Sequence, residues 1–555
     1  MSVLEGNSAV TASPGSADVA PATLAGALLD RLGDSHPGLR HGDLSWTWDA
    51  VVREGGRRAV WLREQRGRAG RPLHVGVLLD NGPEYLFALA GIALSGDVLV
   101  ALNTTRSLTQ LDDDAEHSDV DLVLASARYT GSVAASSRRV IDVADSPWPG
   151  SYQPADSADG PAPADLFSLM FTSGSTSRPK AVRHSHGRLL ARGRQLLGEV
   201  DIDRSSTVYL HMPLFHASTM VGLLLPALLA GATIATRERF SASGFVPDLH
   251  RYGATHTTFV GKTLQYILAR TTTDERKSTL QLAVGNGASD RDIARFSEVF
   301  GCRVHDVYGS TEGGISLRRV AGTPSGSIGV ATAGDVRVLD PVSARECPRA
   351  EVDETGRITN LDDALGEIVR VDGTGSFEGY YENPAAERAR LRDGYFWSGD
   401  LAWRDTEGYF FFAGRSGDMV RVDGENISAH RVQDRIETHP DVQECAVYGI
   451  REAHSDDHLM VTAVLRTGAP ADPNLIFDAL TGSGQLSDRE VPRFVRLART
   501  LPRTPTNKLL VEPLRRQGLH SSDPVWWRPS TRAPFVRLST HQRDDLAGPT
   551  PPAQT

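Results

Sequence analysis

The chain has 555 residues, of which 40% are hydrophobic and 23% are charged, and its formal net charge is −10 at pH 7. This composition is typical of a globular protein with several structural units, and the acidic balance argues against nucleic acid as the main partner, because phosphate backbones are bound by basic surfaces. Three cysteines without close spacing (Cys302, Cys347 and Cys445) exclude a disulfide framework and a cysteine zinc site, and they favour a reducing cytoplasm.

The predicted elements begin after a Ser-, Ala-, Gly- and Pro-rich stretch at residues 1–20, which we expect to be disordered. Short apolar runs then alternate with helical stretches, a pattern typical of a parallel α/β sheet. The expected strands lie at 75–79, 98–100 and 120–124, and the expected helix at 83–94. A second alternation of strands and helices runs over residues 166–309.

Residues 326–415 contain short strands separated by glycine turns, which predicts a β-rich subdomain, and a smaller α/β unit follows. The sequence therefore predicts an α/β fold. Its large N-terminal domain, with two α/β sheets plus the β-rich subdomain, is expected at residues 21–415. A small, mobile α+β domain is expected at residues 416–520 and a polar, Pro-rich tail at residues 521–555.

Neither a secretory signal nor a membrane span is expected. The N-terminus lacks a basic start followed by an apolar core. The longest apolar run, Met220–Ala235, has about 16 residues and contains Pro226 and Gly231, which is short for a membrane span. It predicts a buried helix followed by a buried strand.

Only four of the 59 basic residues are lysines, and two of these close segments with potential phosphate chemistry. Lys180 closes residues 171–180, and Lys508 closes residues 502–508. An ammonium is a compact, strongly hydrated charge whereas a guanidinium is a planar fork, so arginine does not simply replace lysine at a crowded phosphate. The retained lysines favour an enzyme that acts on a nucleotide.

The first of these segments is a candidate phosphate-binding loop. It follows an apolar strand and precedes a helix expected near Gly187, and its hydroxyls and backbone amides can donate hydrogen bonds to phosphate oxygens. The Walker A pattern does not fit, and a plain flexible loop is the alternative. The candidate phosphate ligands are Thr172, Ser173, Gly174, Ser175, Thr176 and Lys180.

A second segment, residues 306–313, carries candidate contacts to a base and a metal. Tyr308 can stack on a purine, Asp306 can accept a hydrogen bond from the exocyclic amine, and Glu312 can bind Mg²⁺ through an oxygen. A simple turn at the end of a strand is the alternative.

A third segment, residues 398–418, offers candidate contacts to a ribose. The Asp400 carboxylate can accept hydrogen bonds from both ribose hydroxyls, with Arg415 beside it. A solvated hairpin with a charged turn is the alternative.

Taken in this order, the four segments resemble the motifs of the adenylate-forming superfamily, which comprises acyl-CoA synthetases, luciferases and non-ribosomal adenylation domains. The resemblance covers roughly residues 24–520. A narrower resemblance is to the fatty-acid-transport/very-long-chain acyl-CoA synthetase branch, whose members activate hydrophobic carboxylic acids. It is carried by Phe259–Lys262, Tyr266–Leu268, Gly285–Gly287, Tyr308–Gly313 and Gly417–Ser428.

The resemblance implies two half-reactions. The acid carboxylate attacks the α-phosphate of ATP and displaces pyrophosphate, and a thiol, usually that of coenzyme A, then attacks the acyl-AMP and expels AMP. Lys508 would bridge the carboxylate and the α-phosphate, while Thr311 and Glu312 would handle phosphate and Mg²⁺. The other residues implied to bind ATP or AMP are Gly285, Asn286, Gly287, Ala288, Asp306, Val307, Tyr308, Gly309, Ser310, Asp400 and Arg415. Gly285–Ala288 and Asp306–Tyr308 would enclose the adenine, and Asp400 and Arg415 would bind the ribose.

The acid-binding residues follow from the same resemblance. His216 matches the histidine that lies beside the reacting carboxylate and gates the acyl pocket, with a histidine of the core or of a loop as the alternative. The candidate pocket walls are Val221, Phe259, Val260 and Gly261, for which ordinary core packing is the competing interpretation. The acid itself stays open between a long-chain fatty acid and a polycyclic steroid or terpenoid acid.

The second half-reaction implies a rotation of the C-terminal domain about a hinge. The hinge position falls at Gly417, where a glycine can absorb a large φ/ψ change. Gly424 would line the tunnel for the pantetheine arm of coenzyme A, with Arg421 and Glu425 close to it in the chain.

Three positions depart from the superfamily pattern. Ser177 and Asn507 stand where glycine is usual, and Val511 stands where an arginine often follows the catalytic lysine. They leave the geometry of the phosphate loop and the efficiency of catalysis open.

We therefore expect an ATP-dependent acid–CoA ligase that uses Mg²⁺ and coenzyme A. The expected location is the cytoplasm. A homodimer is a further possibility, since relatives commonly form one. One alternative is an enzyme that passes its acyl-AMP to a carrier-protein thiol or a partner ligase. The other is a non-catalytic nucleotide-binding scaffold. The joint retention of six motif residues argues against the scaffold; they are Lys180, Thr311, Glu312, Asp400, Arg415 and Lys508.

Overall fold

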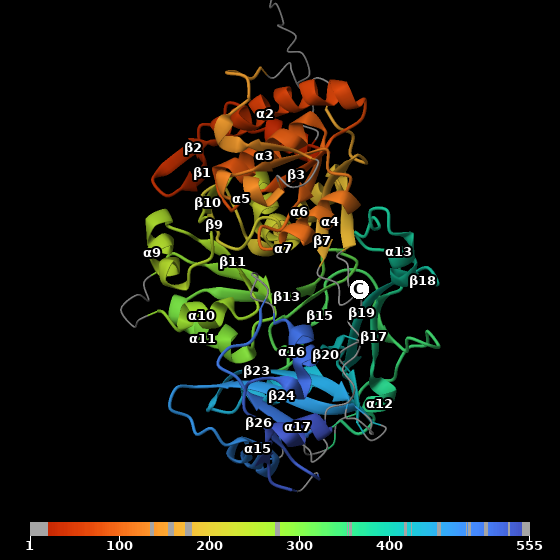
Figure 1. Ribbon diagram of the computed structural model, residues 1–555. Helices are drawn as coiled ribbons and strands as arrows, with labels where there is room; N and C mark the ends of the chain where they lie inside the picture. Colours follow the sequence, from red (N-terminus) through yellow and green to blue (C-terminus); the bar gives the residue numbers. More distant parts are fainter. Residues whose placement is uncertain are drawn as a thin grey trace, which may run out of the picture.

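The computed structural model describes most of the chain. The described residues are 20–133, 138–153, 160–172, 180–271, 278–351, 353, 358–415, 419–422, 425–451, 457–483, 485–486, 490–503, 509–530 and 533–546. They form an N-terminal body of two large α/β sheets, a β-rich subdomain on one side of it, and a smaller C-terminal body (Figure 1). The expected α/β fold with a small C-terminal unit is confirmed.

The first α/β sheet is parallel except at one edge. Its elements are β3 (His74–Leu78), α3 (Pro83–Ser95), β4 (Val98–Ala101), α4 (Leu108–His117), β5 (Leu122–Ala125), α5 (Ala127–Val133), β6 (Arg139–Asp142), β7 (Leu166–Thr172) and β8 (Lys180–Ser185). The strand order is β6-β5-β3-β4-β7-β8, and only the β7–β8 pair of this order is antiparallel. Strands β3, β4 and β5 are buried throughout, as in a sheet covered on both faces. The predicted strands and helix of this region are confirmed.

Helix α3 is apolar on all sides because it lies inside the N-terminal body. Residues 85–95 are all buried, and a helix that is hydrophobic all round is an internal one. Pro83 occupies its first turn, and Gly96 ends it in the left-handed conformation with φ 74°. Helix α2 (Trp48–Ala69) packs directly on it, and a Cβ at Gly55 of α2 would lie 2.5 Å from the Ala90 Cβ. Glycine therefore permits the close approach of the two helices.

The second α/β sheet carries the candidate nucleotide motif of residues 306–313. Its strands are β1 (Pro37–His41), β2 (Leu44–Thr47), β9 (Thr207–Leu210), β10 (Thr233–Thr236), β11 (His256–Val260), β12 (Leu282–Asn286), β13 (Arg303–Gly309), β14 (Ser316–Arg318) and β15 (Val330–Ala331). Their order is β15-β14-β13-β12-β11-β9-β10-β1-β2.

Two layers of helices cover the second sheet. One face packs into the main core, which includes α1 (Leu24–Leu29), α6 (His186–Val200), the π-helix η3 (Met220–Leu224) and α8 (Leu225–Ala230). The other face packs against α9 (Ala242–Tyr252), α10 (Thr263–Leu268) and α11 (Asp290–Phe300). Because η3, α8 and most of β10 lie within Met220–Ala235, the predicted buried helix and strand of that run are confirmed. The short helix α7 (Ala217–Thr219) precedes η3.

The β-rich subdomain and the C-terminal body complete the chain. The subdomain contains β16 (Val336–Leu339), α12 (Leu361–Ala364), β17 (Gly366–Arg370), α13 (Pro384–Arg390), β18 (Leu391–Arg392), β19 (Tyr395–Arg404) and β20 (Phe410–Arg415). The C-terminal body contains β21 (Met419–Val422), β22 (Glu425–Ser428), α14 (Ala429–Glu437), β23 (Val442–Arg451), β24 (Asp457–Leu465), α15 (Pro473–Gly482), β25 (Phe494–Leu497) and α16 (Val511–Gln517).

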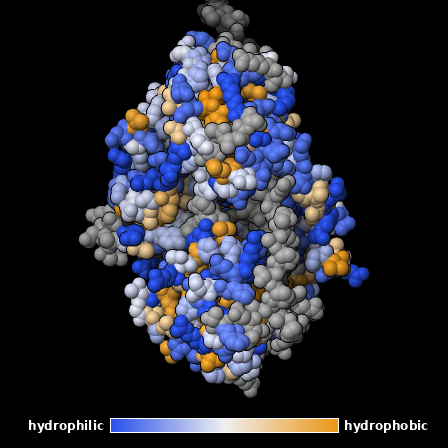
Figure 2. Space-filling view, in the orientation of Figure 1, coloured by the Kyte–Doolittle hydropathy of each residue, from blue (hydrophilic) through white to orange (hydrophobic). Residues whose placement is uncertain are grey.

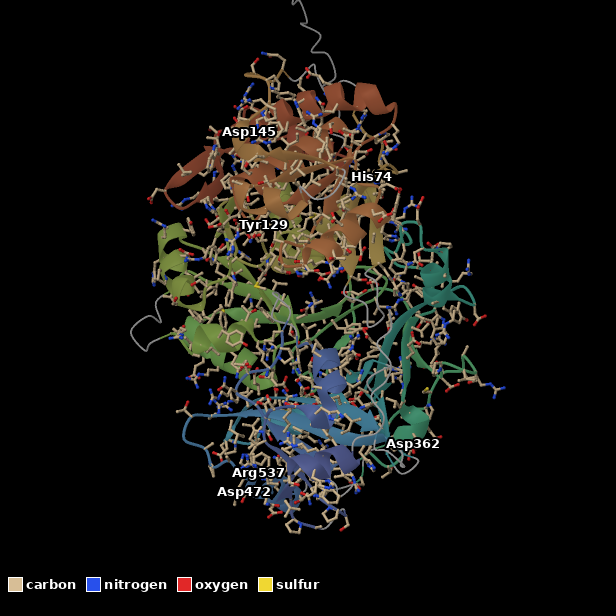
Figure 3. All side chains as sticks on the ribbon, in the orientation of Figure 1. His74, Tyr129, Asp145, Asp362, Asp472 and Arg537 are labelled. Carbon is tan, nitrogen blue, oxygen red and sulfur yellow. The ribbon has the colours of Figure 1, made fainter. Side chains whose placement is uncertain are left out.

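The predicted tail at 521–555 is only partly a tail. Strand β26 (Val525–Trp527) pairs with β25, strand β27 (Val536–Arg537) pairs with β26, and α17 (Thr540–Leu546) follows. Figure 3 shows Arg537 and Asp472, the N-cap of α15, at the same end of the molecule. The boundary expected at residue 520 therefore lies too early, because the two tryptophans of β26 extend the C-terminal sheet.

The surface is mixed in polarity. Figure 2 shows hydrophilic side chains over most of this face, with apolar ones in small separate groups. Within the described parts of the chain, the longest apolar helices are too short or too polar to cross a membrane.

Candidate active site

Strands β12 and β13 lie inside the second sheet, yet their carboxyl ends are open. Residues 284–286 of β12 and 304–308 of β13 are all half-buried, whereas the central strands of the first sheet are fully buried. Partial exposure in the middle of a sheet requires a space over these strand ends. In α/β sheets ligands bind in the crevice at the carboxyl ends of the strands, so this space is the candidate active site.

The segment after β12 closes one side of this space and requires glycine. A Cβ at Gly285 would lie 2.1 Å from the Phe259 carbonyl oxygen, and Gly287 has φ 73°. The Ala288 amide donates a hydrogen bond of 3.4 Å to Asp306 Oδ1. The predicted adenine segment of residues 285–288 and the predicted adenine partner Asp306 are thus brought together.

Asp306 is a carboxyl group in a poorly solvated place. Burial raises its pKa to about 6, although the amides of Ala288 and Gly287 and the charge of Arg319 act in the opposite direction. A carboxylate held this way is stabilised by any further hydrogen-bond donor that enters the space. An exocyclic amine of a purine is such a donor.

Tyr308 and Asp400 come from different sheets and meet at the site. The Tyr308 hydroxyl donates a hydrogen bond of 2.6 Å to Asp400 Oδ2. Asp400 lies in β19 opposite Arg415 of β20, and the Gly399 amide before it donates to Glu367 Oε1 at 2.6 Å. The second and third predicted motifs therefore form one surface. For Arg415 the structure describes the backbone but not the side chain.

Glu312 is the buried acid of the site and has a neighbour that the sequence motifs did not indicate. It is 5% exposed, and the Tyr380 hydroxyl donates to its Oε1 at 2.7 Å. Arg390 Nε in turn donates to the Tyr380 hydroxyl at 3.3 Å. Tyr380 and Arg390 thus fix one oxygen of Glu312, and within the described parts of the chain no hydrogen bond to its second oxygen is found. Their positions, about 70 residues away in the chain, belong to no recognised motif, so no sequence signal pointed to them.

Lys180 stands beside the same group. Its Nζ lies 5.3 Å from the centre of the Tyr380 ring. Burial and the neighbouring Arg390 charge lower the pKa of Lys180, while Glu312 opposes them. Burial also lowers the pKa of His184 to about 4, so this histidine is neutral behind the site. Lys180 is therefore a poorly solvated cation, and a phosphate would stabilise its charge.

The remaining candidates lie at the end of β13 and in the loop that follows it. Val307 is half-buried, Gly309 and Ser310 are exposed, and Thr311 is half-buried just before Glu312. Thr172 ends β7 and pairs with Lys180 of β8. Ser310 and Thr311 thus stand in the loop that leads directly into Glu312.

The candidate acid-binding residues divide between two faces of the second sheet. Val221 of η3 and Val284 of β12 are half-buried at the edge of the main core, and a π-helix such as η3 is frequent at functional sites. Phe259 is 1% exposed and packs with α9, α10 and α11 on the opposite face. For Phe259 the competing interpretation, core packing, therefore holds, because the alternation along β11 points it away from η3.

The other acid-site candidates remain at the edge of the space. His216 is the N-cap of α7, and its ring centre lies 4.6 Å from that of Phe215. Val260 is half-buried at the end of β11, and the amide of Gly261, which has φ 53°, donates to the Asn286 carbonyl oxygen at 2.8 Å.

Several predicted residues lie outside the described residues. They are Ser173, Gly174, Ser175 and Thr176 of the phosphate loop, with Ser177, then Gly417, Gly424, Asn507 and Lys508. For Arg421 and Glu425, in β21 and β22, the structure describes the backbone. The roles expected for these residues stay predictions.

The site fits Mg²⁺ carried by a nucleotide. Among the residues that the structure describes, no group of three or more His, Cys, Asp or Glu side chains could hold a metal ion. Mg²⁺ is usually bound through one or two carboxylates and the substrate phosphates. Glu312 supplies one carboxylate with an oxygen left over, which matches that pattern.

The chain belongs to the family of AMP-binding enzymes. Residues 32–381 match the family model described as AMP-binding enzyme, and residues 432–508 match the model described as AMP-binding enzyme C-terminal domain. The fold and the motif order predicted from the sequence agree with this membership.

The chain is similar to several curated CoA ligases. It is 38% identical over 515 residues to a steroid-22-oyl-CoA synthetase of Rhodococcus jostii (strain RHA1), with 91% of this chain and 92% of the relative covered. It is also 38% identical to the medium/long-chain-fatty-acid–CoA ligase FadD17 of Mycobacterium tuberculosis, with 86% and 93% covered. The expected class, an AMP-forming acid–CoA ligase, is confirmed.

Solved structures support the fold. ATP-bound MatB from Rhodopseudomonas palustris superposes with a TM-score of 0.76 at 23% identity, over 89% of this chain and 98% of that one. An anthranilate CoA ligase, AuaEII, in complex with anthranoyl-AMP gives a TM-score of 0.76 at 20% identity, over 89% and 97%.

Proposed function

We propose that this ligase activates a hydrophobic carboxylic acid, either a long-chain fatty acid or a polycyclic steroid acid, and transfers it to coenzyme A. The observation that carries the proposal is a pair of neighbouring clusters at the end of β13. Asp306 bonds to the Ala288 amide and Tyr308 to Asp400. Four residues after Tyr308, Glu312 bonds to Tyr380, whose ring centre lies 5.3 Å from Lys180 Nζ. The names of the relatives at 38% identity support the two acid classes. The narrower kinship with very-long-chain acyl-CoA synthetases belongs to the same proposal.

In the first half-reaction a carboxylate oxygen forms a bond to the α-phosphorus as the bond to the pyrophosphate oxygen breaks. Catalysis of such a step is mainly positioning and charge stabilisation. Asp306 accepts from the base, Tyr308 and Asp400 hold the sugar side, and Lys180 faces the phosphates. Glu312 would hold a Mg²⁺ ion that enters with ATP, and the ion would supply charge neutralisation at the phosphate oxygens.

Lys508 has the remaining role, a cation between the acid carboxylate and the α-phosphate. Val221, Val284 and Val307 are apolar and half-buried, and they form one side of an apolar pocket. His216 lies at the N-cap of α7, the short helix before η3. An acid with a long or polycyclic apolar body would gain binding free energy there, roughly 25 cal/mol for each Å² of apolar surface buried.

The second half-reaction would follow a rotation of the C-terminal body about Gly417, which lies between β20 and β21. The thiol sulfur of coenzyme A then forms a bond to the acyl carbon, and the bond to the AMP oxygen breaks. We also propose a reducing cytoplasm, supported by the three free, buried cysteines, and we keep the homodimer as a proposal.

Incubation with ATP, Mg²⁺ and a panel of linear and polycyclic acids, with and without coenzyme A, tests the proposed function when acyl-AMP and acyl-CoA are identified by mass spectrometry. We expect acyl-AMP without coenzyme A and acyl-CoA with it. Acyl-AMP that persists in the presence of coenzyme A would favour a carrier-protein thiol or a partner ligase as the acceptor. No product from any acid would favour the scaffold.

A further inference from the structure

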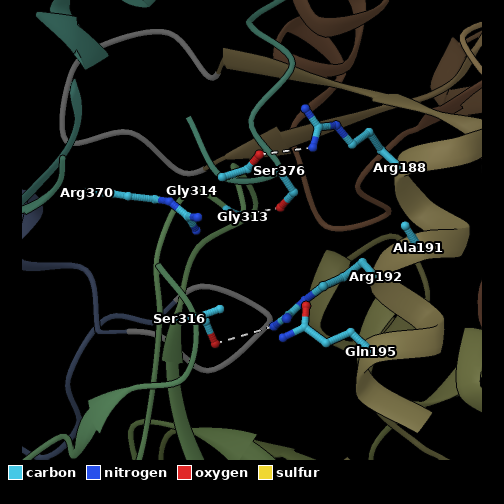
Figure 4. A pocket seen from close by; sticks show the side chains of 11 residues that line it. Arg188, Ala191, Arg192, Gln195, Gly313, Gly314, Ser316, Arg370 and Ser376 are labelled. Carbon is cyan, nitrogen blue, oxygen red and sulfur yellow. Dashed lines mark hydrogen bonds between the residues drawn. The ribbon is translucent and has the colours of Figure 1, made fainter. Parts of the chain in front are cut away.

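A cavity of about 240 Å³ lies between helix α6 and the loops that follow β13 and β17 (Figure 4). Its charged and polar walls come from Arg188, Arg192 and Gln195 of α6, Arg370 of β17, and Ser316 of β14. The rest of the lining is small, with glycine or alanine at most positions. The volume is below the roughly 300–1,000 Å³ of a complete small-molecule site, so the cavity is the size of a subsite.

The cavity adjoins the candidate active site on the face that holds the half-buried valines. Gly313, which lines it, directly follows Glu312. In the antiparallel β13–β14 pair, Ser316 lies opposite Gly309 and Arg318 opposite Val307. Side chains two residues apart on a strand share a face, so Ser316 points to the same side of the sheet as Val307. Helix α6 also packs against η3, which carries Val221.

The three guanidinium groups of the cavity are not equivalent. Arg370 Nε pairs with Asp372 Oδ1 at 2.8 Å, and Arg188 Nε lies 3.7 Å from Glu378 Oε1. Arg192 Nη2 donates to Ser316 Oγ at 3.4 Å, and no carboxylate of the described residues lies within 4.0 Å of it. Among the described residues, Arg192 therefore has no ion pair, and Glu199, which pairs with Arg318, acts on its charge only from a greater distance.

Arg192 is also poorly solvated. Its side chain is half-buried between α6 and β14, and burial lowers its pKa. A guanidinium carries only donors and keeps its charge in proteins. A ligand group that binds Arg192 in the cavity must therefore be a hydrogen-bond acceptor, and a charge-assisted bond there is stronger than one between neutral groups.

We infer that this cavity receives the far end of the acid, and that Arg192 donates hydrogen bonds to an acceptor oxygen carried there, either a ketone or a second carboxylate. The inference rests on the proposed function, because it assigns the acid's apolar body to the valine-lined space. Arg192 selects among acids and takes no part in the bond-forming step. The ligase thus prefers an acid that is oxygenated at the end remote from its reacting carboxyl group.

The experiment compares acids that differ only at the far end. Steady-state pyrophosphate release gives kcat/KM for a polycyclic acid with a ketone on the ring remote from the carboxyl group, its deoxo analogue, a long-chain monocarboxylic acid and the dicarboxylic acid of equal length. Each acid is assayed with the wild type, with Arg192→Met and with Arg194→Met. Arg194 is a matched control because it is exposed on the same helix and bonds to the Pro21 carbonyl oxygen.

We expect the wild type to prefer one oxygen-terminated acid over its analogue by about 10- to 100-fold, since a hydrogen bond to a charged group has that effect. Arg192→Met should lose this preference and Arg194→Met should keep it. The ketone and dicarboxylate pairs distinguish the two sources of the oxygen. The inference would be overturned by equal kcat/KM values within both pairs for the wild type, or by an equal loss of the preference in the two variants. In either case, turnover of the plain acids would still uphold the proposed function. No turnover of any acid would overturn both.

Discussion

The ammonium group of Lys262 lies 2.9 Å from Glu437 Oε1, across the boundary between the N-terminal and C-terminal bodies. Lys262 follows β11 and is preceded by Gly261, whose amide holds Asn286 of the site, whereas Glu437 ends α14. Lys262 Nζ also lies 3.7 Å from Glu444 Oε2, and Glu444 pairs with Arg503. These ion pairs link the end of β11, beside the candidate site, to Glu437, Glu444 and Arg503 of the C-terminal body.

Lys262→Met should slow acyl-AMP formation about tenfold and leave thioester formation from preformed acyl-AMP within about twofold. Losing an exposed ion pair costs roughly 0.2–1 kcal/mol and breaking a buried one roughly 3–5 kcal/mol. This partly buried pair lies between the two, and about 1.4 kcal/mol corresponds to tenfold. Rapid-mixing measurements of each half-reaction separate the two steps. Lys262→Arg retains the charge and serves as the control. Equal slowing of both half-reactions would contradict a role of this ion pair in the adenylating arrangement.

Lys508→Ala should lower the rate of acyl-AMP formation by at least ~10²–10³, because it removes one charge that stabilises the transition state. Pyrophosphate release under single-turnover conditions measures this rate. Lys508→Arg tests whether any cation suffices, and we expect it to recover little activity because the guanidinium fork differs in shape and hydration. Near-normal adenylation by the alanine variant would rule out the proposed role.

Tyr308→Phe should raise the KM for ATP by about 10- to 100-fold and leave the melting temperature nearly unchanged. The substitution removes the hydroxyl that donates to Asp400, and a hydrogen bond to a charged group contributes about 1.5–3 kcal/mol. Tyr409→Phe, in the hairpin that joins β19 to β20, is the matched control. If both variants bound ATP as the wild type does, the Tyr308–Asp400 pair would have no part in holding the nucleotide.

Asp306→Asn should stabilise the nucleotide-free protein above about pH 6. The pKa of Asp306 is raised from 3.8 to about 6 in the folded protein. As the pH rises from about 4 to 6, the unfolded chain therefore loses this proton while the folded protein keeps it. The free energy of unfolding of the wild type falls over that pH range. The gain of the variant should be near zero at pH 4 and reach on the order of 2 kcal/mol at neutral pH. Denaturant unfolding of both proteins across this pH range measures it.

Asp290→Asn provides a control of opposite sign. Burial alone would raise the pKa of Asp290, but hydrogen bonds from Arg319, Ser325 and the Gly326 amide hold it below its ordinary value. The charged Asp290 carboxylate stabilises the fold at neutral pH. This stabilisation is lost as the pH falls from the ordinary aspartate pKa of 3.8 towards the lower pKa of Asp290 in the folded protein. The asparagine variant should therefore be less stable than the wild type at pH 7. A pH-independent difference for Asp306→Asn would contradict the raised pKa.

The nucleotide side of the site could be predicted from the sequence because its residues lie in short segments. Asp306 and Tyr308 follow one another on β13, and the glycines of residues 285–287 end the neighbouring strand, so parallel pairing alone brings them together. The strands and helix of the first sheet were predicted within a few residues for the same reason, since each is a local apolar pattern.

The parts that could not be predicted depend on contacts between distant segments. Tyr380 binds Glu312 across 68 positions in the chain, and Lys262 binds Glu437 across 175. No local pattern encodes such pairs. Phe259 shows a further limit, since an apolar residue on a strand suits either face of the sheet. The direction of the Phe259 side chain depends on how β11 is set within the folded sheet. It points into the core formed with α9, α10 and α11.

The return of the chain through β26 has a consequence for any shortened version of this protein. The family match ends at residue 508, which makes residue 520 an attractive place for a stop codon or a tag. Such a truncation would strip β26 from β25 and leave an unpaired strand edge with its amides and carbonyls exposed, which is a template for aggregation. Poor solubility of a truncated protein would therefore reflect a missing strand.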